Sequence, residues 1–589
     1  MDDQKNFFTA MFLSGLVLLG YWFLVGKPTA ERARAQAALN AEQSQTTQVL
    51  QAEEVRPVES REVLVSRGDR IKIDSPSFTG SFLTTGSRFD DISLKDYDKT
   101  LDPADGFVSL LSPEGAESSA YIMDNWTNLD GGTGANTPWA RLSGNTLTPS
   151  TPIVLGYESN GLSFERTISL DDKFLITLSD KVTNTSSDEK EIIRKGVARQ
   201  HALPEGLTNF FILQEGPISI VDNKYHDMKY KGLSKKGSYR ETGESGWVGL
   251  TDKYWLLGSI APQGKAMTAD YTYRTINDQE VYEVSYGLNP VTLTAGTTIE
   301  SVGHIYVGAK ERTLLKSYEK DLGIAQMERA IDWGFLGLIV KPISWSLSKL
   351  GQLLGNYGLG ILALTLVIKI LLFPLFNKQY EMQAKMKKLQ PKLKKIQELY
   401  KDDRMRLQQE MMGMYKKEGA NPAAGCLPII PTIFVFFALY KSVFINIDLR
   451  HQPFFGWIKD LSAKDPLSIL NGFGAFPWDA IPLPFLSFFA IGPLALMYGV
   501  SMASIYTLTP QNPGAGEQAE MMAKMMKIMP WLFMFILAPF AAGLLLYWVW
   551  NNVLSFAQQY YITRKFKVDT PVDAFFRKIT GKDKPSTSE

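Results

Sequence analysis

A single lysine interrupts an apolar stretch in the second half of the chain. Lys369 lies within the run Tyr357 to Phe376, which is long enough to cross a bilayer at about 1.5 Å per residue. An ammonium group at the centre of a spanning helix costs about 2.5–3.5 kcal/mol on insertion scales, so such a residue normally faces a polar cavity. Thr365, four positions earlier, shares its helix face. The pair therefore marks a candidate functional site.

Other apolar stretches also carry isolated polar side chains. The last stretch places Trp548, Asn552 and Ser555 on one face with Tyr547 and Asn551 beside it, and Thr432 lies in an earlier stretch. Together these residues predict a wet groove whose fixed charge is a cation. The alternative is structural: Lys369 reaches the interface or bonds neighbouring carbonyls, and the asparagines hold helices together.

A basic segment follows the Lys369 stretch. Residues 378–419 hold 12 Lys or Arg against 6 acids. Its apolar residues recur at spacings of four and three, the pattern of a coiled-coil seam, at Met382, Met386, Leu389, Leu393, Ile396 and Tyr400. Asp402 and Asp403 break this pattern, and Leu407, Met411 and Met414 resume it. We therefore expect an antiparallel helical hairpin.

Methionines are concentrated near the ends of the apolar stretches. Ten of the 20 methionines lie in residues 378–420 and 510–527. Flexible thioethers make adaptable surfaces for varied apolar partners. The expected contact residues are Met382, Met386, Met411, Met414, Met521, Met522 and Met525. The alternative for the first segment is that its methionines fill the seam of the hairpin.

The composition excludes several functions. A net charge of +1 over 589 residues gives no global basic field for DNA. The four histidines (His201, His226, His304 and His451) lack metal-ligand spacing, and no phosphate-binding glycine loop or GxSxG motif is present. The single cysteine, Cys426, excludes an intramolecular disulfide. We therefore expect no enzyme, no metal and no cofactor.

The first half of the chain has a different pattern. Residues 7–25 are uncharged and predict an uncleaved membrane anchor, with a removable signal sequence as the alternative. Residues 61–310 alternate polar and apolar side chains in short runs, which indicates a large antiparallel β-sandwich. Trp333 to Leu354 is amphipathic and suits a helix in the membrane interface, or else one packed on the sandwich.

The positive-inside rule places the basic segment and the basic C-terminal tail in the cytoplasm. Six spans then put both termini in the cytoplasm and the β-domain outside. The expected boundaries are an N-terminal anchor 1–26, a polar linker 27–60, a β-sandwich domain 61–310, connecting and interfacial helices 311–354, a second span 355–377, a helical hairpin 378–420, a third span 421–445, an external loop 446–484, a fourth span 485–507, a Met-rich loop 508–523, a fifth span 524–538, a sixth span 539–563 and a basic tail 564–589.

Several ordered motifs resemble the YidC/Oxa/Alb family of membrane-protein insertases. GNYGLGILALTLVIKILLFPLFNKQY is similar to the family's cation-bearing span, and the basic segment through NPAAGCLP is similar to its cytoplasmic hairpin. LRHQPFFGWIKDLSAKDPL and GLLLYWVWNNVLSFAQQYYITR resemble its external loop and last span. The anchor and β-domain imply the Gram-negative form. That form is a polytopic α-helical inner-membrane protein with a five-helix core and a periplasmic all-β supersandwich.

The resemblance implies an insertase and chaperone for inner-membrane proteins that works alone or with the Sec translocon and needs no nucleotide. It implies nascent membrane proteins, ribosomes, the signal-recognition targeting machinery and lipids as partners. Lys369 stands where the family usually has arginine, Thr365 and Trp548 stand at substrate-contacting groove positions, and Asn552 is a matching polar residue. Thr432 replaces a common glutamine beside a shifted proline, Pro431.

The sequence is also compatible with two other functions. An anion or solute transporter or channel could use Lys369 as a counter-ion, and paired, inverted broken helices would support it. An exported sugar-binding or sugar-modifying domain on a membrane base rests on fold analogy alone.

Overall fold

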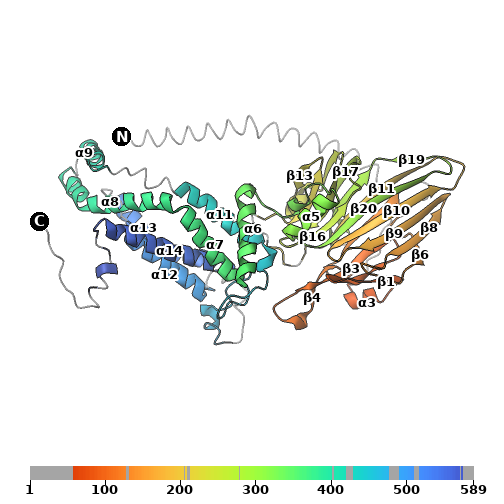
Figure 1. Ribbon diagram of the computed structural model, residues 1–589, viewed down its shortest axis with the longest axis horizontal. Helices are drawn as coiled ribbons and strands as arrows, with labels where there is room; N and C mark the ends of the chain where they lie inside the picture. Colours follow the sequence, from red (N-terminus) through yellow and green to blue (C-terminus); the bar gives the residue numbers. More distant parts are fainter. Residues whose placement is uncertain are drawn as a thin grey trace. The chain divides into compact units, whose positions relative to one another are not determined.

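Figure 1 shows the computed structural model of the chain. It describes residues 58–127, 132–204, 206–208, 213–276, 279–400, 403–419, 429–476, 490–509, 517–568, 570, 572–574 and 577. The chain divides into two compact units, residues 1–57 and 58–589. The predicted N-terminal anchor and most of the polar linker lie outside the described residues, as does most of the basic tail.

Two large sheets form the β-domain (Figure 1). The first has eleven strands: β14 (Ser238–Gly243), β17 (Met267–Ile276), β18 (Gln279–Leu288), β11 (Lys190–His201), β5 (Ala120–Thr127), β3 (Arg88–Asp98), β2 (Phe78–Leu83), β1 (Arg70–Asp74) and β7 (Thr146–Leu147) in spatial order, with β19 (Val291–Leu293) beside β11 and β4 (Phe107–Leu111) beside β3. The second has nine: β13 (Lys224–Asp227), β12 (Gly216–Val221), β15 (Gly246–Thr251), β16 (Trp255–Ile260), β20 (Thr298–Ala309), β10 (Leu175–Asn184), β9 (Leu162–Leu170), β8 (Ile153–Ser159) and β6 (Ala140–Ser143). A short helix, α3 (Arg61–Val65), precedes β1.

The predicted alternation sets the register of the core. In the antiparallel pair of β9 and β10, Phe164 lies opposite Val182 and Leu170 lies opposite Ile176, and all four side chains are buried. Side chains two residues apart on a strand point to the same face, so each strand contributes one apolar row. The sandwich expected from the sequence is confirmed.

Four inward positions of these strands carry charges instead of apolar groups. Arg166 and Asp180 come from the nine-stranded sheet, Arg194 and Asp124 from the eleven-stranded sheet, and all four are buried. Arg166 Nε and Nη2 each donate to Asp180 at 2.7 Å, and Arg194 Nε donates to Asp124 Oδ1 at 2.9 Å. We call this group the inter-sheet ion cluster. It joins the two sheets through their common core.

His304 on β20 lies near this cluster, with its Nδ1 at 3.0 Å from the Thr177 hydroxyl. Burial, together with the nearby Arg194 charge, lowers the pKa of His304 from 6.5 to about 4. The native state therefore keeps the imidazole neutral between pH 4 and 6.5, whereas the unfolded chain takes up a proton. Stability should fall as the pH decreases through this window.

We expect the local opening free energy of β10 and β20 to decrease by about 2 kcal/mol more in the wild type than in His304→Gln between pH 7 and 4.5. Amide hydrogen exchange of both proteins at each pH measures this difference. The carboxylates titrate in both proteins, so the difference between the wild type and the variant isolates the contribution of His304. Equal losses in the two proteins would contradict the assignment to His304.

Short helices connect the β-domain to the rest of the chain: α5 (Arg312–Asp321), the 3₁₀ turn η3 (Met327–Ala330) and α6 (Gly337–Leu354). The expected interfacial helix starts later than predicted, because Trp333 lies before it and is only 7% exposed. Its indole N–H donates to the Glu328 carbonyl at 3.2 Å. Trp333 is therefore a core residue, whereas Trp345 on α6 is 56% exposed.

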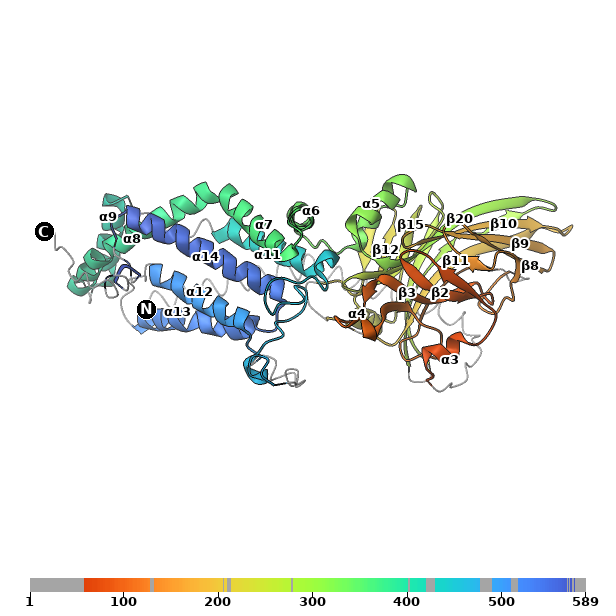
Figure 2. The same ribbon diagram turned by 60° about the horizontal axis from the view of Figure 1, so that its bottom comes forward.

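The C-terminal part consists of helices: α7 (Tyr357–Leu371), α8 (Phe373–Leu399), α9 (Arg404–Lys417), α11 (Ile429–Ile445), α12 (Pro493–Leu508), α13 (Glu517–Leu537) and α14 (Ala542–Lys565), with two 3₁₀ turns, η4 (Ile447–Leu449) and η5 (Ile469–Asn471). Figure 2 shows α12 running alongside α14, with α13 against α12. Among the described residues, no unbroken helix is both long and apolar enough to cross a bilayer; the bent pair α7 and α8 would suffice together, and residues 433–445 and 493–508 are shorter apolar helices.

Two predicted elements differ from the structure. The second span, expected to be continuous over 355–377, bends by 70° at Leu372. The Met-rich loop expected at 508–523 is helical from Glu517 onward, because α13 extends beyond the apolar stretch by more than two turns. Charge and methionine content do not prevent a helix from continuing into water.

Candidate functional site

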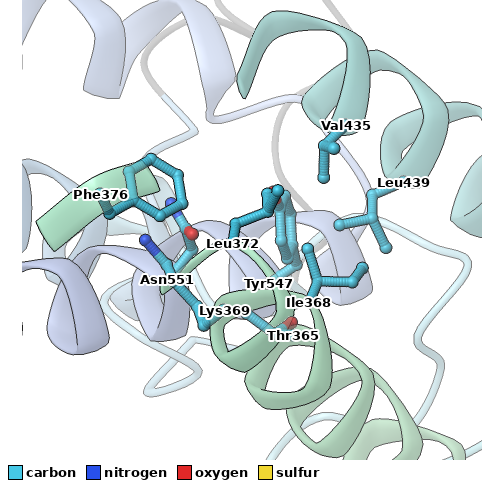
Figure 3. A pocket seen from close by; sticks show the side chains of 9 residues that line it. All are labelled: Thr365, Ile368, Lys369, Leu372, Phe376, Val435, Leu439, Tyr547 and Asn551. Atoms are coloured by element: carbon cyan, nitrogen blue, oxygen red, sulfur yellow. The ribbon is translucent and has the colours of Figure 1, made fainter. Parts of the chain in front are cut away.

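A small cavity surrounds the Lys369 side chain (Figure 3). It is lined from α7, the start of α8, α11 and α14 by Thr365, Ile368, Lys369, Leu372, Phe376, Val435, Leu439, Tyr547 and Asn551. Its volume of about 20 Å³ has room for about one water molecule. The cation therefore lies in a narrow site among mostly apolar walls.

Lys369 is half-buried and bound to neutral groups. Its Nζ donates to Ser555 Oγ on α14 at 2.7 Å and lies 4.5 Å from the centre of the Phe376 ring. Ser555 in turn donates to the Asn551 carbonyl at 2.6 Å. In the part of the chain that the structure describes, no carboxylate pairs with this ammonium group. Its charge is thus available to an anionic ligand.

The bend between α7 and α8 positions the lysine. Pro374 lies in the first turn of α8. It has no N–H to donate, and in an unbroken helix its ring would collide with the carbonyl four residues earlier, so the helix breaks before it. Lys369 consequently sits in the last turn of α7, next to carbonyls that no longer have helical partners. A cation is favourable at a helix C-terminus, which offsets part of the cost of its burial.

Replacing Pro374 by alanine should straighten this bend. Nitroxide labels at Leu366 on α7 and Lys388 on α8, with Cys426 replaced by serine, report the distance across it. At 1.5 Å per residue, complete straightening of a 70° bend lengthens the distance by about 5 Å. An unchanged distance in Pro374→Ala would show that tertiary packing, rather than proline, holds the bend.

The structure brings together four of the predicted groove residues. Thr365, Lys369, Tyr547 and Asn551 all line the cavity, and Figure 3 shows Lys369 extending toward Asn551 and Phe376. The Thr365 hydroxyl donates to the Ile361 carbonyl at 2.7 Å, so it is bonded within its own helix. Tyr547 and Asn551 are four residues apart and present one face of α14 to α7.

Two predicted groove residues face elsewhere. Trp548 stacks on Phe436 with ring centres 5.6 Å apart and also contacts Tyr498 of α12. Asn552 donates to Ser501 of α12 at 3.1 Å. The residues of the predicted face therefore separate: Ser555 binds Lys369, whereas Trp548 and Asn552 contact α11 and α12. The Thr432 side chain lies outside the described residues.

The methionines divide into two groups. Met382, Met386, Met411 and Met414 pack with Leu389 and Leu393 between α8 and α9, so they fill the seam of the hairpin. Met405 and Met412 of the hairpin are instead exposed, as are Met521 and Met525 of α13. The Met522 side chain lies outside the described residues. The alternative considered for the first segment therefore holds. In the hairpin the exposed methionines, Met405 and Met412, are not the predicted ones, whereas Met521 and Met525 of α13 are exposed and were predicted.

Sequence reasoning missed three contributors to the site. Phe376 supplies an aromatic face, Tyr380 stacks on Phe376, and Pro374 lies at the bend of the helix. The Phe-Pro pair at residues 373 and 374, inside the apolar run, was the available signal for the bend. Among the described residues, no group of three His, Cys, Asp or Glu side chains could hold a metal ion.

Comparison with known proteins places this arrangement in a family. The family described as "60Kd inner membrane protein" matches residues 349–569, and the one described as "YidC periplasmic domain" matches residues 70–346. The membrane protein insertase YidC of Maricaulis maris is 41% identical over 99% of both chains. The chain belongs to the YidC family of membrane protein insertases. It is therefore an inner-membrane protein insertase whose β-domain is periplasmic.

A second relative supports this assignment, and one solved structure shows a similarity only. The membrane protein insertase YidC of Dinoroseobacter shibae is 39% identical over 99% of this chain and 100% of its own length. A crystal structure titled "Active YidC insertase crystal structure with the first transmembrane domain resolved" covers 85% of this chain and 96% of its own, at 15% identity and a TM-score of 0.36. YidC insertases are not enzymes, which agrees with the sequence-based expectation.

Proposed function

We propose that this insertase draws the polar tail of its substrate into the site around Lys369. The observation that carries the proposal is the half-buried ammonium group, which is bound to a neutral hydroxyl and has no carboxylate partner among the described residues. An acidic side chain entering the site would gain a charge-assisted bond that Ser555 cannot supply. The groove thereby lowers the cost of moving the tail across the membrane.

The surrounding residues have separate roles in this proposal. Thr365, Tyr547 and Asn551 form the wall beside the cation, while Trp548 and Asn552 hold α14 against α12. On α11, next to the cavity, Ile433, Phe434 and Phe437 are exposed apolar side chains. They offer a hydrophobic substrate helix a route from the site into lipid. Thr432 belongs to the same helix and remains a candidate groove residue.

The proposed topology has six spans, with both termini in the cytoplasm and the hairpin of α8 and α9 on that side. The charge bias of residues 378–419 supports this orientation. The β-domain is periplasmic and the proposed hairpin is cytoplasmic, so the chain between them must cross the membrane an odd number of times, and the second span supplies one crossing. We retain the expected boundaries as domain limits, except that α13 begins at Glu517 and the bend at Leu372 lies inside the second span.

We further propose a chaperone role and cooperation with the Sec translocon, ribosomes and the signal-recognition machinery. Exposed lysines on α8, among them Lys388, Lys392, Lys394 and Lys395, support contact with ribosomal RNA phosphates. Such contact should weaken as salt increases. The exposed Met405, Met412, Met521 and Met525 offer apolar contact to nascent membrane proteins.

Vesicles containing only this protein test whether it inserts unaided. A single-span substrate with an acidic tail should become protected from external protease at a rate that rises with the amount of insertase. Vesicles without insertase, and vesicles with the heat-inactivated protein, are the controls. Protection that is the same in all three would contradict autonomous insertion. Solute flux through the same vesicles, if it accompanied a lack of protection, would instead support the transporter.

A further inference from the structure

The loop between α11 and α12 lies on the periplasmic side of the insertase. Within it, Arg450 Nη2 donates to the Asp98 carbonyl of the periplasmic domain at 2.7 Å, and its guanidinium lies over the Trp255 ring. The loop directly joins two helices of the membrane region. It therefore starts and ends at the level where the bilayer meets the periplasm.

In one turn of this loop, residues 468–476, most backbone N–H groups are bonded within the turn. Ser468 and Asn471 form a reciprocal capping box around the short helix η5. The Asn471 amide also donates to the Pro466 carbonyl at 3.0 Å and its Oδ1 accepts from Gly474 N at 3.1 Å. Backbone groups that are bonded internally are what a segment needs before it can enter an apolar environment.

The same turn directs apolar side chains outward. Ile469 is 50% exposed and Phe473 is 43% exposed, although Asn471 between them is buried. Residues 466–476 contain no charged side chain. The polar residues of the turn thus point inward and the apolar ones outward, the reverse of an ordinary solvated loop.

The backbone at Phe473 is held in an unusual conformation. Its φ of 55° is left-handed, and it lies between Gly472 and Gly474, whose φ values of 59° and 86° are also positive. Aromatic residues rarely adopt this region, so the surrounding bonds must impose it. One of them is the bond of 2.7 Å from Phe473 N to the Ser468 carbonyl.

The turn is also fixed to the membrane helix that follows it. Asp465 Oδ2 accepts from Leu494 N in the first turn of α12 at 3.1 Å, and its Oδ1 accepts from the Trp457 indole at 3.0 Å. Ile469 N donates to the Ile491 carbonyl at 3.0 Å. In Figure 2, the loop lies at the end of the bundle where α12 begins. Its depth is therefore set by α12.

We propose that this turn, residues 468–476, inserts Ile469 and Phe473 into the outer leaflet of the inner membrane. The occupant of this apolar surface is phospholipid, at the boundary between head groups and acyl chains. A protein partner fits poorly, because a stable interface takes about 800 Å² per partner and this turn exposes only a few side chains. The inserted turn would fix the periplasmic end of α12 at a constant depth, independently of the proposed groove.

Collision measurements on the full-length protein in phospholipid vesicles test this proposal. Cys426 is replaced by serine, and a nitroxide is attached in Phe473→Cys, in Ile469→Cys and in the control Lys181→Cys on an exposed part of β10. At positions 473 and 469, apolar oxygen should collide with the label more often than a water-soluble nickel chelate does. At position 181 the order should be reversed.

Two outcomes would overturn the proposal. In the first, the labels at 473 and 469 collide more often with the nickel chelate than with oxygen, as the label at 181 does, which would place the turn in water. The other is a label shielded from both reagents, which would mean that protein covers the turn. Ile469, Phe473 and Lys181 are exposed, so labelling them is not expected to unfold the protein, and the control at 181 shows that the vesicles and reagents work.

Discussion

Lys369→Glu should slow the insertion of substrates with acidic tails by about tenfold or more. Two unit charges about 5 Å apart, at an effective dielectric constant of about 20, interact with about 3 kcal/mol. Even half of this energy is about a tenfold change in rate. Reversing the sign of the charge at the site replaces attraction by repulsion, so the effect should be largest for the most acidic tails.

Lys369→Arg should retain insertion, because the charge is kept, and Lys369→Ala should lie between the two. The matched control is Lys378→Glu, which makes the same charge change at an exposed position on α8. Protease protection of substrates with acidic and neutral tails measures all four variants in vesicles. If Lys369→Glu and Lys378→Glu behaved alike, the charge at the cavity would have no special role.

Asp180→Asn should destabilise the periplasmic domain by about 3–5 kcal/mol, because removing one partner leaves buried charges uncompensated. Asp180 accepts from Arg166 and also from the Trp126 indole at 2.8 Å, so both of its oxygens are used. Arg194 Nη2 lies 3.5 Å from the same carboxylate. The variant would leave two buried guanidinium groups facing a single remaining carboxylate, Asp124.

The control is Asp270→Asn, which removes an ion pair with Arg240. The Arg240 side chain is 54% exposed and the Asp270 side chain is 29% exposed. Such a pair contributes about 0–1 kcal/mol. Urea titration of the detergent-solubilised protein, followed by amide exchange in β9 and β10, gives both values. A loss below 1 kcal/mol in Asp180→Asn would show that water or a rearranged side chain compensates for the missing charge.

The sequence predicted the class of fold because burial on a strand leaves a period of two. The inter-sheet ion cluster follows the same period: in LSFERTISL, Arg166 occupies an inward position between Phe164 and Ile168. The sequence therefore indicates that Arg166 is a buried charge. It does not indicate which residues pair with Arg166, because pairing between two sheets depends on the order of the strands, which a single strand does not encode.

At the candidate site, helix periodicity related Thr365 to Lys369 and Tyr547 to Asn551, and these four residues line the cavity. Periodicity could not tell which face of α14 turns toward α7. It grouped Trp548 and Asn552 with Ser555, whereas in the structure these two residues contact α11 and α12. The orientation is set by contacts between helices far apart in the chain, such as Trp550 Nε1 to the Leu362 carbonyl at 3.2 Å.

The central claim is that the substrate tail passes beside Lys369, and disulfide cross-linking to an arrested nascent chain tests it most directly. Val435→Cys places a thiol in the cavity wall, and Val553→Cys places one on an exposed part of α14, both with Cys426 replaced by serine. A cysteine in the acidic tail should cross-link to position 435 and not to position 553. Equal cross-linking at both positions, or cross-linking at 553 alone, would contradict the account.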